Sequence, residues 1–96
     1  MPYIDRDART HIGEYIENLY IDYPIDTAGE LNYLISKCIH EYLKYKVAEP
    51  ASLKYNLLNE VHGVLHCADM ELYRTVTAPY ENVKRAVNGP VSNFDL

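Results

Sequence analysis

The residues with the clearest potential for chemistry are two histidines, His62 and His66, which lie four positions apart. On a helix this spacing places both imidazoles on one side, where they can share a metal ion with a third ligand from elsewhere. Cys67 and Glu60 are close in sequence, but the zincin pattern needs a glutamate directly after the first histidine, and that position is Gly63. Because no set of three or four ligands converges, we predict no metal site and no cofactor.

Nucleophilic catalysis would need a cysteine beside a histidine, and the chain has two such neighbours. Cys38 and His40 are two positions apart, and His66 and Cys67 are adjacent, so their side chains diverge on a helix. The sequence contains no nucleophile elbow, glycine-rich phosphate loop or CxxC motif. We therefore predict no catalytic residues and no enzyme activity. Both cysteines lie on apolar or small-residue stripes, which favours two buried thiols over a disulfide.

A third group of residues surrounds Pro79 and could bind an anionic, nucleotide-like ligand. The arginine offers a planar guanidinium that suits a phosphate, and the tyrosine rings offer flat surfaces for a base. The predicted ligand-binding residues are Asn59, Tyr73, Arg74, Tyr80 and Lys84. In the alternative interpretation, Arg74 pairs with Glu71 or Glu81 and only stabilises the bend around Pro79.

The aromatic composition indicates that the protein has a partner. The 96 residues include ten tyrosines, one phenylalanine and no tryptophan, and tyrosine suits half-buried positions and interfaces. Ten tyrosines exceed what so small a core can bury with every hydroxyl satisfied. Gly63 and Cys67 are small residues four apart on a helix, which would let a second helix approach closely. We therefore predict a homo-oligomer, with the commonest closed form being a dimer, and place Gly63 and Cys67 at its interface.

Charge and hydropathy bear on partners and location. The formal net charge of -5 argues against general nucleic-acid binding, which depends on neutralising phosphates. No apolar run approaches the ~20 residues of a membrane span, and residues 1–20 contain no apolar segment of a signal peptide. We expect a cytoplasmic protein that has no membrane partner.

Helical periodicity predicts the elements that must position these residues. A first helix is expected over 7–20. A second begins at a capping box, Thr27 to Glu30, and ends near Val47. A third has Ser52 as its N-cap, and Pro79 either kinks it or restarts it with Thr77 as a cap. Asn88-Gly89-Pro90 is a strong helix stop.

These elements predict an all-α fold: a small antiparallel bundle of three long helices plus a short C-terminal helix after Pro79. A single domain would cover 1–90, followed by a C-terminal tail over 91–96. The predicted core residues are Leu34, Ile35, Ile39, Leu58, Val61, Leu65 and Leu72.

Several segments together resemble a family of small uncharacterised proteins encoded by tailed bacteriophages and prophages. They are the opening Met-Pro-Tyr-Ile, GELNYLI (29–35), NEVHGVL (59–65), ELYR (71–74), APYENVK (78–84) and Asn88-Gly89. The resemblance implies a phage or bacterial cytoplasmic setting. The chain departs from the family pattern at Pro90, where an acidic ending is expected, and at His66, where a glutamate is expected.

The first functional hypothesis is a non-enzymatic accessory protein that self-associates and binds or sequesters a host component. Within this class we favour a host-defence antagonist that acts as a sponge for a nucleotide-type signal. The alternatives are a protein-directed adaptor or inhibitor with a tyrosine-rich face, and a virion or replication assembly component. A polar pocket lined by Arg74, Tyr80 and Lys84 would favour the sponge, whereas a flat tyrosine surface without a pocket would favour the adaptor.

Overall fold

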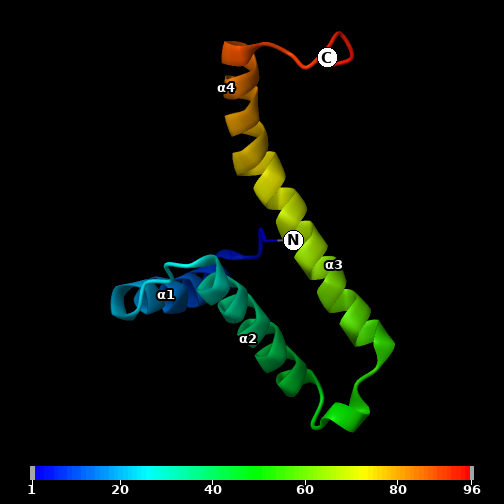
Figure 1. Cartoon of the computed structure of the whole chain (residues 1–96). Helices are drawn as coiled ribbons and strands as arrows, with labels where there is room; N and C mark the ends of the chain where they lie inside the picture. The colour runs from blue at the N-terminus through cyan, green and yellow to red at the C-terminus, as the bar shows by residue number, and fades with distance from the viewer. Residues whose placement is uncertain (1, 96) are drawn as a thin grey trace. The chain divides into compact units, whose positions relative to one another are not determined.

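The computed structural model describes residues 2–95, and helices make up most of them (Figure 1). The elements in order are α1 (Arg6–Asp22), α2 (Ala28–Lys46), the 3-10 turn η1 (Pro50–Ser52), α3 (Tyr55–Leu72), the π turn η2 (Tyr73–Thr77) and α4 (Ala78–Asn88). No strand occurs among the described residues, so the predicted all-α class is confirmed. Contacts divide the chain into two units, 1–61 and 62–96. The antiparallel bundle, the single domain over 1–90 and the tail over 91–96 stay predictions.

Local capping explains where α1 and α2 begin. The Asp5 carboxylate accepts a hydrogen bond from the Ala8 amide at 3.0 Å, which satisfies one of the free N–H groups of the first turn of α1. At α2 the Thr27 hydroxyl accepts from the Glu30 amide at 3.0 Å, and the Glu30 carboxylate accepts from the Thr27 amide at 3.0 Å. The predicted capping box is therefore confirmed.

The start of α3 differs from the prediction. Ser52 does not cap it, because Pro50–Ser52 form the turn η1 and Leu53 then adopts an extended conformation with φ -62° and ψ 136°. Helix α3 begins at Tyr55, two residues after Leu53. Proline suits the first position of a tight turn, since its φ is already fixed and its missing N–H is not needed there.

Of the two outcomes expected at Pro79, a kink or a restart capped by Thr77, the restart is wrong. Thr77 has helical angles, φ -70° and ψ -46°, and its side chain makes no capping bond. The helical run instead continues from α3 through η2 into α4, with the Ala78 amide donating to the Tyr73 carbonyl five residues back. This wider turn accommodates Pro79, whose ring would clash with the carbonyl four residues earlier in a regular α-helix. α4 is thus a continuation and not a separate short helix.

The predicted stop at the end of this run is confirmed. The Gly89 amide donates to the Arg85 carbonyl at 2.8 Å, and Gly89 then turns the chain with a φ of +89°. Glycine adopts this left-handed backbone region without the steric cost that a side chain would add.

Side-chain burial is the main departure from expectation. No residue among those described is buried. Of the predicted core, Leu34, Ile39 and Val61 are partly covered, and the other four residues are exposed. All ten tyrosines are exposed. Cys38 and Cys67 are also exposed free thiols, so the prediction that they are buried is wrong.

Candidate functional site

The second unit contains four of the five predicted ligand-binding residues. Tyr73 and Arg74 lie on η2, and Tyr80 and Lys84 lie on α4. Asn59 lies on α3 within the first unit. The aromatic and basic members of the predicted site therefore lie on the π turn and on the helix that follows it.

Arg74 has a partner on the turn before it. Its guanidinium forms an ion pair with the Glu71 carboxylate, which is the pairing that the alternative interpretation predicted. The side chain of Glu71 is 20% exposed and that of Arg74 is 68% exposed. The Thr75 hydroxyl donates to the Glu71 carbonyl at 2.7 Å, so two side chains brace the π turn on Glu71. A role of Arg74 in ligand binding stays a prediction.

Tyr80 and Lys84 are paired with each other. The Lys84 ammonium lies 5.7 Å from the centroid of the Tyr80 ring, within the range of a cation–π contact. Both side chains are exposed. The contact keeps a positive charge beside an aromatic ring on one side of α4.

An open cavity of about 480 Å³ lies against α4, but only two of the predicted residues line it, Tyr73 and Lys84. Its walls also carry Arg85, Glu81 and Asp95. Two positive and two negative side chains therefore face this space, so its charge is balanced. Arg74 and Tyr80 do not line this cavity, and a polar pocket of Arg74, Tyr80 and Lys84 stays a prediction.

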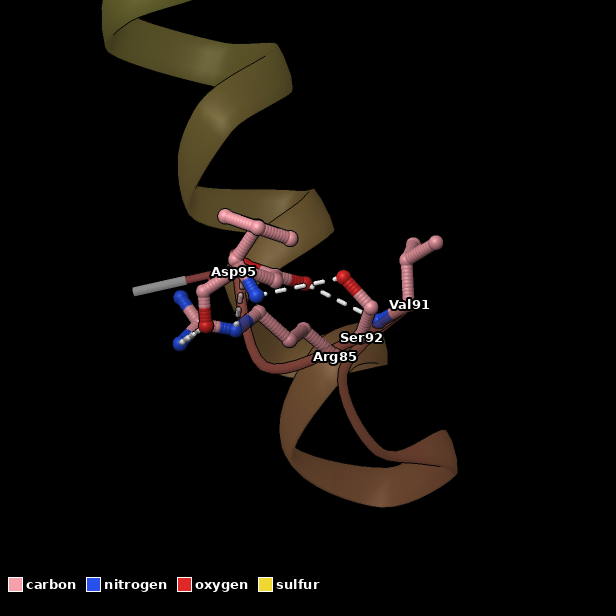
Figure 2. Close-up of polar contacts among 5 residues, drawn as sticks. Arg85, Val91, Ser92 and Asp95 are labelled. Carbon is pink, nitrogen blue, oxygen red and sulfur yellow. Dashed lines mark hydrogen bonds and ion pairs between the residues drawn. The ribbon is translucent and has the colours of Figure 1, made fainter.

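The segment after α4 closes one side of this cavity, and sequence reasoning missed how it is held. The Asp95 carboxylate forms an ion pair with Arg85 at 3.1 Å and accepts from the Val91 amide at 3.1 Å (Figure 2). The Asp95 amide donates to the Ser92 carbonyl at 3.1 Å. The signal in the sequence is an acidic residue that follows a Gly-Pro turn and can return to a basic residue on the helix.

A second open cavity, also of about 480 Å³, lies in the first unit where α1 turns into α2. Most of its lining is apolar or aromatic, and two charged residues complete it. The lining residues are Leu19, Tyr23, Ile25, Gly29, Glu30, Tyr33, Leu34 and Lys37. The Tyr23 hydroxyl donates to the Glu30 carboxylate at 2.9 Å, a contact seven residues apart that sequence reasoning also missed. The Asp26 amide donates to the same carboxylate at 3.2 Å. Glu30 therefore secures the whole turn.

These contacts shift two pKa values in opposite directions. The pKa of Glu30 is lowered, first by the hydrogen bond from the Tyr23 hydroxyl and then by the bonds from the Thr27 and Asp26 amides, which all favour the carboxylate. The pKa of Tyr23 is raised, because its proton is held by that carboxylate and ionisation would place two negative charges together.

The described residues were also compared with the requirements of a metal site and of a membrane-spanning helix. Within 2–95, no group of three or more His, Cys, Asp or Glu side chains could hold a metal ion. His62 and His66 are exposed on α3. A Cβ atom added at Gly63 would meet no atom within 4 Å, so its side of α3 has room for a partner. None of the described helices is both long and apolar enough to cross a membrane.

The fold and the candidate site together define a small all-helical protein that presents exposed apolar and aromatic side chains and open cavities. The chain belongs to the family described as a domain of unknown function (DUF6899), whose model matches residues 1–91. The resemblance to an uncharacterised family is thereby confirmed. No curated protein and no solved structure matches the chain.

Proposed function

We propose that this protein is a non-enzymatic phage accessory protein that self-associates and captures a host protein on its exposed aromatic faces. One observation carries the proposal: in a chain that is 48% hydrophobic, no residue among 2–95 is buried. Burial of apolar surface is the main favourable term in folding and association. A chain that leaves so much apolar surface open gains most of its stability from partners, of which another copy is the nearest.

The tyrosines support capture of a protein. All ten are exposed, and the two most exposed are Tyr45 at 89% and Tyr55 at 80%, near the end of α2 and at the start of α3. Tyrosine is enriched in protein interfaces because its ring buries a large area and its hydroxyl still finds a hydrogen bond. A host-defence component is the class of target that a phage accessory protein would block by stoichiometric binding.

The test is purification of the tagged protein from bacterial cells, followed by light scattering and native mass spectrometry. We expect the mass to correspond to a complex of two or more 11.1 kDa chains with a host protein bound in a fixed ratio. Replacing both tyrosines, Tyr45→Ala with Tyr55→Ala, should remove the host protein and leave the helix content unchanged. The matched control replaces a neighbouring lysine at each place, Lys44→Ala with Lys54→Ala, and should retain it. A bare 11.1 kDa monomer, or equal capture by both variants, would contradict the proposal.

A second candidate is sequestration of an anionic nucleotide-type signal. The observation that favours it is the cavity beside α4, where Tyr73, Lys84 and Arg85 lie together with the amides of Asn82 and Asn88. A ring, a lysine and two amides are suitable groups for a base and a phosphate, while Arg85 is paired with Asp95 and Glu81 also lines the cavity. Calorimetry with cyclic and linear nucleotides tests this candidate. Binding should weaken at least about tenfold in Lys84→Ala, since a hydrogen bond to a charged group is lost, and no heat with any nucleotide would exclude it.

A further inference from the structure

Seven apolar positions form one exposed stripe along α3, η2 and α4 within the second unit. We call this stripe the apolar seam, and it consists of Leu65, Ala68, Leu72, Val76, Tyr80, Val83 and Val87. All seven are exposed, and among the six larger side chains the exposed fraction runs from 38% at Leu65 to 77% at Val87. No described residue of the second unit covers the seam.

The spacing of the seam is that of a coiled coil with one residue too many. Apolar residues of a coiled coil alternate in steps of three and four, whereas the steps from Ala68 through Leu72 and Val76 to Tyr80 are all four. In an uninterrupted α-helix, three successive steps of four would turn the stripe by about 120° around the axis.

The π turn η2 corrects this excess. It lies at Tyr73–Thr77, inside the run of fours, and its hydrogen bond reaches back five residues, so the turn holds about one residue more than an α-helical turn. One residue between Leu72 and Tyr80 is thus taken up. The seam then has the regular alternation of three and four on one side of the helix, as required for a partner helix of the same period.

We propose that the occupant of the apolar seam is the same seam of a second copy, running antiparallel. This inference rests on the self-association proposed above and adds its surface, direction and register. Two charged residues support the choice. Asp69 and Lys84 each follow a seam position directly, Ala68 and Val83, and so lie along the same edge of the seam.

Asp69 and Lys84 are placed symmetrically about the centre of the seam. The midpoint of Leu65 and Val87 is Val76, and the midpoint of Asp69 and Lys84 falls between Val76 and Thr77. A two-fold axis at this point places Asp69 of each copy beside Lys84 of the other, so the pair forms twice. In a parallel dimer, Asp69 would instead lie level with Asp69 of the other copy, and Lys84 level with Lys84. The contact of Lys84 with the Tyr80 ring at 5.7 Å keeps its ammonium near the seam.

The first experiment compares two substitutions of matched exposure, Leu72→Glu on the seam and Met70→Glu on the other side of the same helix. Their side chains are 56% and 57% exposed. Analytical ultracentrifugation of the full chain should show that Leu72→Glu raises the dissociation constant at least about tenfold, and that Met70→Glu leaves it unchanged. Circular dichroism confirms that both variants stay helical.

The outcomes of this experiment separate the two proposals. A wild-type chain that sediments as an 11.1 kDa monomer at all concentrations overturns self-association, and the seam with it. An oligomer that is equally stable in wild type and Leu72→Glu overturns the seam alone. If Leu72→Glu unfolds, the charge variants below still test the seam without changing an apolar residue.

The second experiment tests whether the two seams run antiparallel. It uses a chain in which Cys38→Ser and Cys67→Ser remove the two native thiols. Under mild oxidation, Val76→Cys at the proposed axis should form a covalent dimer, whereas Leu65→Cys should not. Ready cross-linking of Leu65→Cys with itself would overturn the antiparallel arrangement. Asp69→Lys should weaken the dimer, and Asp69→Lys combined with Lys84→Asp should restore it. Failure of the double variant to recover would overturn the proposed register.

Discussion

The two places where one helix gives way to the next are built in different ways. Between α1 and α2 the chain stops, turns and restarts, and hydrogen bonds to the Glu30 carboxylate secure the turn. Between α3 and α4 the helix does not stop, and a π turn carries it past Pro79. The first junction is stabilised by local contacts alone, because the hydrogen-bond partners of its polar groups lie within a few residues. The second sets the direction of the apolar seam, which no described residue of the second unit covers, and under the proposed self-association it decides the register of the dimer.

Insertion of one alanine after Thr75 should produce the largest effect of the changes considered. It adds a second extra residue to the run between Leu72 and Tyr80, of which η2 takes up only one, so the seam positions from Val76 onward rotate by about 100° relative to Leu72. We expect the self-associated form to be lost, as measured by sedimentation, together with a lower melting temperature. The control is insertion of one alanine after Asn93, which lies beyond α4 and outside the seam. Retention of the dimer after the insertion at Thr75 would show that the residue count of η2 does not set the register.

Substitution of Thr27→Ala should have a moderate effect and should not alter association. It removes the hydroxyl that accepts from the Glu30 amide at the start of α2, and loss of such a cap costs about 0.5–2 kcal/mol. Chemical denaturation monitored by circular dichroism measures the change in the free energy of unfolding. Ser36→Ala, an exposed hydroxyl within the same helix that bonds to Asn32 at 3.3 Å, is the control and should cost less. Equal effects of the two would mean that the capping box contributes little.

Substitution of Tyr23→Phe should change how stability depends on pH. Because the pKa of Glu30 is lowered in the folded chain, its carboxylate adds stability above its unfolded pKa, and this is lost as pH falls through the lower folded pKa. Removing the Tyr23 hydroxyl should raise the folded pKa of Glu30 and reduce the loss of stability in acid. A carboxyl NMR titration measures the pKa directly. The control is Tyr33→Phe, which lines the same cavity, and an unchanged Glu30 titration in Tyr23→Phe would contradict the expectation.

The smallest effect is expected for Lys44→Ala on α2. Its ammonium lies 3.3 Å from the Glu41 carboxylate, which Lys37 also contacts at 3.1 Å. Both pairs are solvent-exposed, and such pairs add little to stability. The melting temperature should stay within measurement error, while the pKa of Glu41, lowered first by Lys37 and next by Lys44, should rise towards its usual value. A marked loss of stability would show that α2 depends on its surface charges.

Helix positions and ends were predictable where the signal was local. The capping box at Thr27, the end of α2 near Val47 and the stop at Gly89 depend on residues within one helical turn, and each appears as predicted. Ser52 and Thr77 failed as caps because other local effects prevailed. Pro50 directed the chain into η1, and the helix crossed Pro79 by widening its turn. A capping residue indicates where a helix can start, and neighbouring backbone constraints decide whether it does.

The candidate site was less predictable, because proximity in sequence near a bend does not ensure that side chains converge. The chemistry at Tyr73, Arg74, Tyr80 and Lys84 was visible as residue types. Their partners lie one helical turn away: Arg74 pairs with Glu71, as the alternative interpretation predicted, and Lys84 faces the Tyr80 ring. The contact of Asp95 with Arg85 required the chain to reverse after Gly89, which composition does not reveal.

The sequence by itself determined the all-α class and the apolar period of each helix, because these follow from side chains within a few residues of one another. Only the tertiary structure decided that the helical run is continuous past Pro79, that the tyrosines and both cysteines are exposed, and that one seam of the second unit is uncovered. The physical reason is that periodicity indicates which face of a helix must be buried. What buries it depends on contacts between segments that no local pattern specifies.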